Sequence, residues 1–391
     1  MPPRKICFVI TSFIHYARNL LILEELNCRA DTELHVVIGG TALLSKYTPR
    51  YGQVRGMLEE DGVRNIHELY FALEGDNRVV KAKTAGLGIV EFATVFNDLK
   101  PDLVVVRGDR FEVLSAATAA AYMNIPLAHI EGGDVSGTLD ESVRHAITKL
   151  AHLHIATNEA ARGRLLRMGE DPRAVFNFGS PDVEVAETFA KDTETGARDL
   201  ASTGSGASLD PGEDFMMVMY HPVWSEALES GKLRRRTEEL LAVVHTLGIP
   251  ALWFWPNADV GSEEISHTLR VFHDQTERHH IRFMRYLPPR SFISLLARSR
   301  LLIGNSSAGI KECSYLGVPV VNIGSRQRGR QRAENVLDVE HESAAIRSAI
   351  EQQLAVGRFA PSALYQRDGT ARSIATTLAS APLYIEKQFC E

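Results

Sequence analysis

The chain has 391 residues, of which 45% are hydrophobic and 24% charged, and its formal net charge is -6 at pH 7. A chain of this length exceeds the size at which a single core usually stops growing, so we expect two domains. The acidic balance argues against a nucleic-acid-binding protein, and the four widely spaced cysteines argue against a disulfide framework and favour a reducing compartment.

The first half of the chain alternates strand-like and helix-like segments. The apolar run at residues 6–10 is too short for a signal peptide or a membrane span and predicts a buried strand of a cytosolic protein. Further strand-like runs are found at residues 34–38, 103–106, 127–130 and 154–156. This alternation is typical of a parallel sheet wrapped by helices, and we assign residues 1–190 to a first Rossmann-like domain.

Acidic side chains follow two neighbouring strands of this domain. A helix-favouring, alanine-rich segment at residues 113–123 separates the two strands, which gives a βαβ unit. Asp109 follows the first strand, Glu131 follows the second, and Asp140 lies one short loop later. Ligands of open α/β sheets bind beyond the carboxyl ends of the strands. We therefore expect these acids around one cleft, where crowding allows one carboxyl group to donate a proton while another accepts one.

A polar segment precedes the second half of the chain. Residues 191–214 are rich in Gly, Ser, Thr and Asp, which predicts a flexible linker. Strand signals resume at residues 215–220, 251–255, 301–303 and 318–323, with helical segments at 232–247 and 289–297. We expect residues 215–368 to form a second doubly wound domain.

The second domain has the residues that an anionic ligand needs. The sequence Gly-Asn-Ser-Ser-Ala-Gly-Ile-Lys-Glu at residues 304–312 follows a predicted strand and opens a helix, a place where backbone N–H groups bind phosphate. Glu312 is suited to accept hydrogen bonds from ribose hydroxyls. Four arginines alternate at positions 326 to 332, and a guanidinium fork fits a diphosphate. Together these features predict a nucleoside diphosphate.

These motifs resemble the hydrolysing UDP-N-acetylglucosamine 2-epimerases of sialic-acid, legionaminic-acid and related pathways. The resemblance covers most of residues 100–184 and separate blocks at 220–222, 255–261 and 304–336. It implies the glycosyltransferase-B type of fold, an α/β architecture of two doubly wound Rossmann-like domains facing a central cleft. It further implies that residues 369–391 form a helix that packs back on the first domain, and that the protein is a homo-oligomer, either a dimer or a tetramer.

The resemblance also implies site residues. The catalytic acids of the family fall on Asp109, Glu131 and Asp140, and its catalytic histidine falls on His221. Substrate-binding residues fall on Arg110, Arg144, Glu184, Asn257, Ser306, Ser307, Glu312 and Arg326.

The implied reaction converts UDP-N-acetylglucosamine, or a related 2-acetamido sugar nucleotide such as a 2,4-diacetamido-2,4,6-trideoxy sugar, to a free manno-configured sugar and a nucleoside diphosphate. Elimination removes the C2 proton and breaks the C1–O bond, and hydration follows with inversion at C2. The base and the neutralisation of the leaving group come from side chains, and no cofactor or metal is expected. We expect Asp109 and Glu131 next to C2, Asp140 positioning Arg144 or hydrating the intermediate, and His221 near the departing phosphate.

The chain departs from the family pattern in two places. Family members usually have an arginine directly after the first strand and its serine, whereas this chain has Phe13 at that position. Either Arg18 or His15 compensates from the next helical turn, or the substrate has a different nucleotide or sugar. Glu184 replaces the aspartate that is usual in the family.

Simpler roles remain open for several of these residues. Asp140 and Arg144 have the spacing of a helix-surface ion pair, worth roughly 0.2–0.5 kcal/mol, and Ser306 and Ser307 have the character of helix N-caps. The sequence lacks a Gly-x-Gly-x-x-Gly motif, a phosphate-binding loop and a zinc motif. The alternative functions are a non-hydrolysing 2-epimerase, a glycosyltransferase on the same scaffold and a non-catalytic nucleotide-sugar sensor. All of them bind a small molecule, and none requires a nucleic acid or a membrane.

Overall fold

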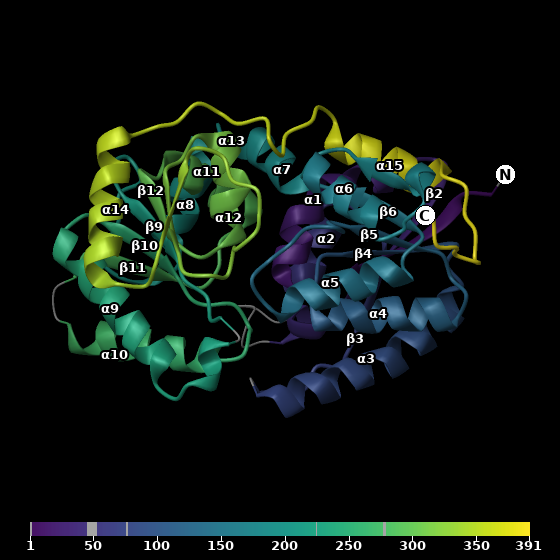
Figure 1. The fold of residues 1–391 in the computed structure, drawn as a ribbon, viewed down its shortest axis with the longest axis horizontal. Helices are drawn as coiled ribbons and strands as arrows, with labels where there is room; N and C mark the ends of the chain where they lie inside the picture. Colours follow the sequence, from purple (N-terminus) through teal and green to yellow (C-terminus); the bar gives the residue numbers. More distant parts are fainter. Residues whose placement is uncertain (1, 45–52, 76, 224, 277–278) are drawn as a thin grey trace. The chain divides into compact units, whose positions relative to one another are not determined.

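The computed structural model describes residues 2–44, 53–75, 77–223, 225–276 and 279–391, and Figure 1 shows the fold. The chain divides into two compact units. Unit 1 comprises Met1–Val135, Leu139–Glu184 and Arg367–Glu391, and unit 2 comprises Ser136–Thr138 and Val185–Gln366. The segment expected as a linker belongs to unit 2, where it contains helix α8 (Thr193–Ser202) and strand β8 (Ser205–Gly206). Asp192 is the N-cap of α8, because its carboxylate accepts a hydrogen bond from the backbone N of Thr195 at 3.2 Å.

Unit 1 contains a parallel sheet of seven strands in the order β3-β2-β1-β4-β5-β6-β7. The strands are β1 (Arg4–Ile10), β2 (Thr32–Gly39), β3 (Asn65–Leu69), β4 (Leu103–Arg107), β5 (Leu127–Ile130), β6 (Leu153–Ala156) and β7 (Val175–Asn177). All residues of β4 and β5 are buried, as expected for parallel strands covered on both faces. Val104 and Val106 of β4 pack in one cluster with Phe92 and Phe96.

The helices of unit 1 connect and cover these strands. They are α1 (Phe13–Asn27), α2 (Gln53–Glu60), α3 (Arg78–Leu99), α4 (Phe111–Tyr122), α5 (Leu139–Leu150), α6 (Glu159–Arg167) and α15 (Thr370–Ser380), with 3-10 helices at Gly40–Leu43 and Pro172–Ala174. Helix α7 (Pro181–Phe189) leads the chain from unit 1 into unit 2. Helix α15, near the C-terminus, packs against α1.

Unit 2 repeats this architecture. Its strands are β9 (Met216–Met219), β10 (Ala251–Phe254), β11 (Ile281–Met284), β12 (Leu301–Gly304), β13 (Val320–Ile323) and β14 (Val336–Val339), in the order β14-β13-β12-β9-β10-β11-β8. Strand β8 pairs antiparallel with β11, and the other pairs are parallel. The helices are α9 (Lys232–Leu247), α10 (Ser262–Gln275), α11 (Pro289–Arg298), α12 (Ser307–Ile310), α13 (Glu312–Leu316) and α14 (Ser343–Val356), with a 3-10 helix at Glu226–Leu228.

The strand order of each sheet reverses at one point. In unit 1 the chain starts at β1, adds β2 and β3 on one side, and then crosses to β4 on the other side. In unit 2, after the short edge strand β8, the parallel strands start at β9, continue with β10 and β11, and cross to β12. The ends of neighbouring strands at such a switch point form the ligand crevice of doubly wound folds. The predicted α/β class with two doubly wound units is therefore confirmed, and each unit has its own switch point.

Candidate active site

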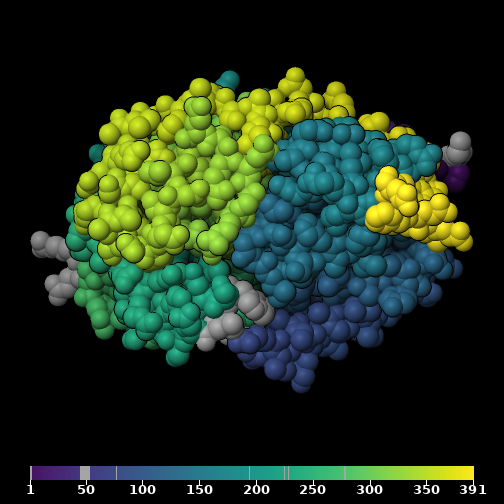
Figure 2. All heavy atoms as spheres, in the orientation of Figure 1, coloured from purple at the N-terminus to yellow at the C-terminus, as the bar shows by residue number. Residues whose placement is uncertain are grey.

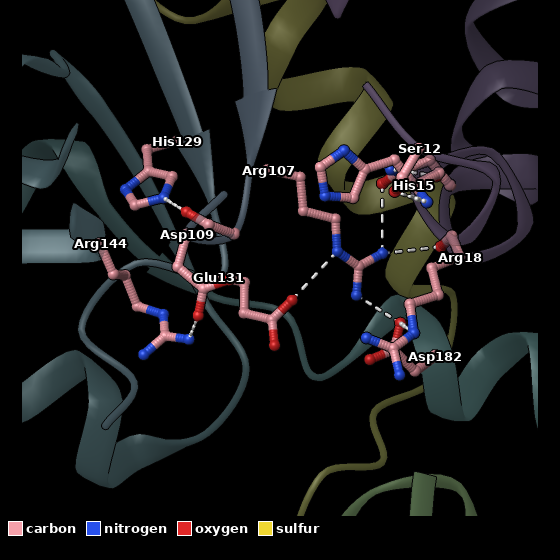
Figure 3. A network of polar contacts seen from close by, with 11 residues as sticks. Ser12, His15, Arg18, Arg107, Asp109, His129, Glu131, Arg144 and Asp182 are labelled. Carbon is pink, nitrogen blue, oxygen red and sulfur yellow. Dashed lines mark hydrogen bonds and ion pairs between the residues drawn. The ribbon is translucent and has the colours of Figure 1, made fainter. Parts of the chain in front are cut away.

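The predicted acids Asp109 and Glu131 lie just beyond the carboxyl ends of β4 and β5, on the β4 side of the unit 1 switch point (Figure 3). The backbone N of Glu131 donates to the carbonyl of Ile155 at 2.8 Å, so sheet pairing continues up to this residue. Glu131 has a φ of 71°, in the left-handed region that non-glycine residues seldom adopt. Strained backbone of this kind is concentrated at functional sites.

Arg107, the last residue of β4, binds the carboxylate of Glu131. Its side chain is buried, and its Nε donates to Glu131 Oε2 at 3.1 Å. The guanidinium also donates to the carbonyl of Arg18 at 2.8 Å, to Asn19 Oδ1 at 3.2 Å and to the carboxylate of Asp182. Two carboxylates thus balance this buried charge, and the fork geometry fixes the orientation of Glu131.

Arg144 of α5 holds the other acid. Its buried guanidinium donates to Asp109 Oδ2 and, through Nη1, to the carbonyl of Asp134 at 3.2 Å. Arg144 therefore bridges the β4 end to the loop that follows β5. Asp140 lies in the first turn of the same helix and is half-buried.

Two neutral imidazoles line this region. His129 Nε2 lies 2.8 Å from the carbonyl of Gly108, which only accepts, so Nε2 has the proton, and Nδ1 lies 3.1 Å from Thr148 Oγ1. Burial lowers the pKa of His129 to about 4. Burial, followed by the nearby arginine guanidinium groups, lowers the pKa of His15 well below its usual value. Both rings are uncharged at neutral pH.

The turn after β1 shows where the unusual Phe13 lies. Ser12 caps α1 by accepting a hydrogen bond from the backbone N of His15 at 3.3 Å, and Phe13 is the first residue of the helix. Arg18, one turn later, has its Nε 3.7 Å from Asp182 Oδ1. Arg18 therefore joins the cluster around Arg107 and Asp182 in this structure.

Two predicted substrate-binding residues of unit 1 have partners within the protein. Arg110 donates to the carboxylate of Glu112 at 3.1 and 2.9 Å. Glu184 Oε2 accepts from the backbone N of Ala371 at 2.6 Å, in the first turn of α15. A carboxylate at this position satisfies a free N–H group of the helix and is favoured by the helix dipole. Glu184 thus connects α7 to the C-terminal helix.

Sequence reasoning missed Arg107 as a member of the site and Asp182 entirely. Asp182 is 1% exposed and lies two residues before Glu184. An arginine at the end of an otherwise apolar strand is a signal that a buried counter-ion exists, because a lone buried charge is costly. No signal in the sequence identifies Asp182 as that counter-ion.

The switch point of unit 2 positions His221. Its backbone N donates to Asn305 Oδ1 at 2.8 Å, and Asn305 Nδ2 donates to the carbonyl of His221 at 2.8 Å, which ties the ends of β9 and β12 together. The backbone N of Asn257 donates to His221 Nδ1 at 3.2 Å. The ring of His221 therefore has its proton on Nε2. Asn305 is a further residue that the site prediction did not include.

Arg326 and Asn257 both contact the carboxylate of Asp259. Asn257 Nδ2 donates to Asp259 Oδ2 at 2.6 Å, and Arg326 Nη2 lies 3.5 Å from the same oxygen. Arg326 Nη1 also donates to the carbonyl of Asn305 at 3.3 Å. Arg326 is therefore beside the end of β12.

The motif after β12 forms two short helices. Ser306 caps α12 by accepting from the backbone N of Ala308 at 3.3 Å, and Ser307 is the first residue of α12. Glu312 is buried at the start of α13. Gly304 makes the turn possible, because its φ is 134° and a Cβ at this position would lie 2.1 Å from the carbonyl O of Met219. The structure thus brings His221, Asn257, Ser306 and Arg326 to one end of the unit 2 sheet.

No group of three or more His, Cys, Asp or Glu side chains in the described ranges has an arrangement that suits a metal ion. None of the described helices is long and apolar enough to cross a membrane. The cytosolic location stays a prediction.

The sequence is similar to known sugar-nucleotide enzymes. It matches the UDP-N-acetylglucosamine 2-epimerase family over residues 24–379. It is 32% identical to a UDP-N,N'-diacetylbacillosamine 2-epimerase (hydrolyzing) of Legionella pneumophila, over 97% of each chain. It is 31% identical to a GDP/UDP-N,N'-diacetylbacillosamine 2-epimerase (hydrolyzing) of Campylobacter jejuni, over 87% of this chain and 85% of that protein.

The fold is similar to solved structures. A UDP-GlcNAc 2-epimerase from Neisseria meningitidis bound to UDP-GlcNAc superposes with a TM-score of 0.76 at 17% identity, over 96% of this chain and 99% of that chain. The enzyme from Methanocaldococcus jannaschii in complex with UDP-GlcNAc and UDP gives a TM-score of 0.75 at 17% identity, with coverage of 96% and 99%. At this identity the likeness shows a shared fold.

Proposed function

The chain belongs to the UDP-N-acetylglucosamine 2-epimerase family, and from that premise we propose that it is a hydrolysing nucleotide-sugar 2-epimerase. The observation that carries this function is the 32% identity to a hydrolysing 2-epimerase over 97% of both chains. The resemblance inferred from the sequence motifs is therefore confirmed, as is the enzyme class. The reaction releases a nucleoside diphosphate and a free 2-acetamido sugar with inverted C2.

We assign the sugar chemistry to unit 1. In the first step a carboxylate removes the C2 proton, and the electron pair of the breaking C1–O bond leaves with the nucleoside diphosphate, which gives a 2-acetamidoglycal. In the second step water supplies a hydroxyl to C1, and a proton reaches C2 from the opposite face. Asp109 and Glu131 serve as the acid and base next to C2, and Asp140 assists hydration. Separate guanidinium groups hold the two main acids, because Arg144 binds Asp109 and Arg107 binds Glu131.

We assign the nucleotide diphosphate to unit 2. His221 accepts at Nδ1 from the backbone of Asn257, so its Nε2–H is the group that donates to the departing phosphate. Arg326 supplies positive charge to the diphosphate. The remaining nucleotide contacts in this proposal are Asn257, Ser306, Ser307 and Glu312.

For the substrate we propose a nucleotide-linked 2,4-diacetamido-2,4,6-trideoxy sugar. The names of the L. pneumophila and C. jejuni relatives support this choice. Binding roles for Arg110 and Glu184 receive less support, since Glu112 and the start of α15 occupy their side chains.

Proton NMR in deuterated water tests the function directly. The purified protein is incubated, without added metal or NAD, with the UDP and GDP forms of the diacetamido sugar and with UDP-N-acetylglucosamine. We expect release of the nucleoside diphosphate together with a free manno-configured sugar that has deuterium at C2. Epimerisation without nucleotide release would identify a non-hydrolysing enzyme, and absence of turnover with all three substrates would overturn the proposal.

A pair of variants tests the assignment of the acid. Asp109→Asn keeps the size of the side chain and removes its ability to accept a proton, so we expect turnover to fall by at least a hundredfold. Asp274→Asn makes the same change on the exposed surface of α10 and is the matched control. Equal activity of both variants would remove Asp109 from the mechanism.

A further inference from the structure

His15, in the first turn of α1, is a buried polar residue at the switch point of unit 1. It is 7% exposed, and few purple atoms of the segment around β1 and α1 reach the face that Figure 2 draws. Figure 3 shows it next to Arg107, whose guanidinium binds Glu131. Helix α1 begins directly beyond β1, the strand that pairs with β4 across the switch point. His15 therefore lies where doubly wound folds bind their ligands.

The backbone of His15 makes the contacts that α1 needs at this position. Its N–H donates to Ser12 Oγ at 3.3 Å, and its carbonyl accepts from Asn19 Nδ2 at 2.6 Å. Both are main-chain groups, so any residue at position 15 can form these two hydrogen bonds. The cap of α1 and the buried Asn19 consequently do not require an imidazole, and the side chain has a different role.

One edge of the His15 ring is fixed and the other edge is accessible. Nδ1 lies 3.1 Å from Oγ1 of the fully buried Thr11. Nε2 has no hydrogen-bond partner among the residues that the structure describes, and it is not one of the enclosed polar atoms. It lies toward Gly108, where a Cβ would be 4.0 Å away. Because glycine has no side chain to cover it, Nε2 is open to a small molecule next to the loop that contains Asp109.

The surroundings of the ring keep it uncharged. Burial lowers the pKa of His15 well below its usual value, and the guanidinium groups of three arginines act in the same direction. These are Arg110, Arg107 and Arg18, and Glu131 opposes them. A neutral imidazole offers one hydrogen bond at Nε2 and no charge. It therefore suits an uncharged polar group of a ligand better than a phosphate.

We propose that His15 is a further substrate-binding residue of unit 1, whose Nε2 hydrogen-bonds an uncharged polar substituent of the sugar, a hydroxyl or an acetamido group. This inference rests on the proposed function, which assigns the sugar to unit 1 and the diphosphate to unit 2. The bound sugar gives Nε2 the partner that the protein does not supply. Losing this hydrogen bond leaves a polar group of the enclosed sugar unpaired, so it weakens sugar binding.

Two amide substitutions at position 15 test the proposal, because each keeps one edge of the ring. The amide of His15→Gln reaches the position of Nε2, whereas the amide of His15→Asn reaches only that of Nδ1. We expect the Asn variant to raise the dissociation constant of the nucleotide sugar by about tenfold or more, and the Gln variant to change it by less than about threefold. The dissociation constant of UDP should stay within about twofold in both variants, since the proposed nucleotide contacts lie in unit 2.

Titration calorimetry measures both constants in the full chain with Asp109→Asn, a background in which we expect slow turnover. The ligands are UDP and the UDP forms of the diacetamido sugar and of N-acetylglucosamine. His267→Asn, on the exposed surface of α10, is the matched control. A melting curve of each variant checks that the chain stays folded.

The two amide variants give opposite results if the ring of His15 is only structural. Weaker sugar binding by the Gln variant than by the Asn variant would show that the contact with Thr11 is what matters, and equal affinities of the two variants would also overturn the proposal. An equal loss of UDP affinity would contradict the assignment to the sugar. Absence of turnover by the unaltered chain would overturn the proposed reaction and leave this binding test in place. Absence of binding of both nucleotide sugars would overturn both.

Discussion

At the scale of single residues, Arg107 connects the site to the interior of unit 1. Its one guanidinium binds Glu131 and Asp182 and also the backbone of α1. A lysine ammonium at this position lacks the planar fork and cannot hold both carboxylates in the same geometry. We expect Arg107→Lys to lower kcat by at least tenfold with little change in KM, since the proposed nucleotide contacts lie in unit 2.

Steady-state kinetics and a melting curve of Arg107→Lys distinguish a loss of the orientation of Glu131 from a loss of folding. Arg173→Lys is the control, because Arg173 pairs with Asp171 at the surface of unit 1 and its side chain is 90% exposed. Asp182→Asn removes the second carboxylate but leaves Arg107 bound to Glu131, so its effect on kcat should be smaller than that of Arg107→Lys. A rise in KM alone would show that Arg107 does not position the acid.

His129 makes the stability of unit 1 depend on pH. Burial lowers its pKa to about 4, whereas in the unfolded chain an ordinary histidine titrates near 6.5. Between these values the unfolded state binds more protons, so stability is lost as the pH falls from about 6.5 to 4. A shift of this size corresponds to about 3 kcal/mol below pH 4.

Thermal melts from pH 7 to pH 4 measure this effect. In His129→Gln the amide donates to the Gly108 carbonyl but does not titrate, so its melting temperature should fall less over this range than that of the unaltered chain. His267→Gln, on the exposed surface of α10, is the matched control for the loss of one imidazole. Parallel curves for His129→Gln and the unaltered chain would contradict the assignment of a neutral buried imidazole.

At the scale of elements, Glu184 fastens the C-terminal helix of unit 1. Its carboxylate accepts from the first turn of α15, whose preceding residue Gly369 offers no capping side chain. Losing such a cap costs about 0.5–2 kcal/mol. We expect Glu184→Ala to lower the melting temperature while KM stays within twofold. Glu351→Ala, on the exposed surface of helix α14, is the control for the loss of one acid. A raised KM at unchanged stability would instead support the substrate-binding role that the sequence suggested.

Buried elements with strong apolar runs could be predicted from the sequence, and marginal ones could not. The predicted helix at residues 232–247 coincides with α9, and the predicted strands at 127–130 and 251–255 agree with β5 and β10 within one residue. Strands β3, β7, β8, β11 and β14 were missed. Strands β3 and β14 have no fully buried residue, β7 and β8 have three and two residues, and Arg282 interrupts the apolar run of β11. Helix α8 was not predicted, because it lies within the long polar segment and is stabilised by packing against α11.

The residues of the candidate site that directly follow a strand could be predicted from the sequence. Asp109 and His221 follow strands that flank the switch points, and Glu131 follows the next strand, β5, so topology alone places all three at the carboxyl ends of their sheets. The partners of these residues come from distant parts of the chain, as Asp182 does for Arg107 and Asn305 for His221. Such pairs depend on tertiary packing, which hydrophobic periodicity does not encode.

At the scale of the whole molecule, unit 1 is completed by the last residues of the chain. Unit 2 is an insertion between Glu184 and Arg367, apart from residues 136–138. After α15, the tail contacts the residues just before β6 and just after α6: Tyr384 Oη donates to the carbonyl of His152 at 2.9 Å, and the backbone N of Cys390 donates to the carbonyl of Gly169 at 3.0 Å.

Lys387 gives this tail its electrostatic anchor. Its Nζ lies 2.5 Å from Glu170 Oε2, and Lys149 Nζ lies 2.7 Å from Oε1 of the same carboxylate. Although burial opposes ionisation, the hydrogen bond from His154 and these two ammonium groups lower the pKa of Glu170 to about 2. The folded state therefore gains stability from ionised Glu170 above about pH 4.5 and loses it as the pH falls toward 2.

Deleting residues 381–391 should consequently destabilise unit 1, and more so at neutral than at acidic pH. Above pH 4.5 the deletion removes both the backbone contacts of the tail and the partner of an ionised, buried carboxylate. Near pH 2 Glu170 becomes protonated, and the cost falls to that of the backbone contacts. Lys387→Met separates the two contributions, because it leaves the rest of the tail in place and should reproduce only the pH-dependent part. Melting temperatures of the three proteins at pH 7, 4 and 2 measure this difference, and a loss that is independent of pH would show that Lys387 does not stabilise the charge of Glu170.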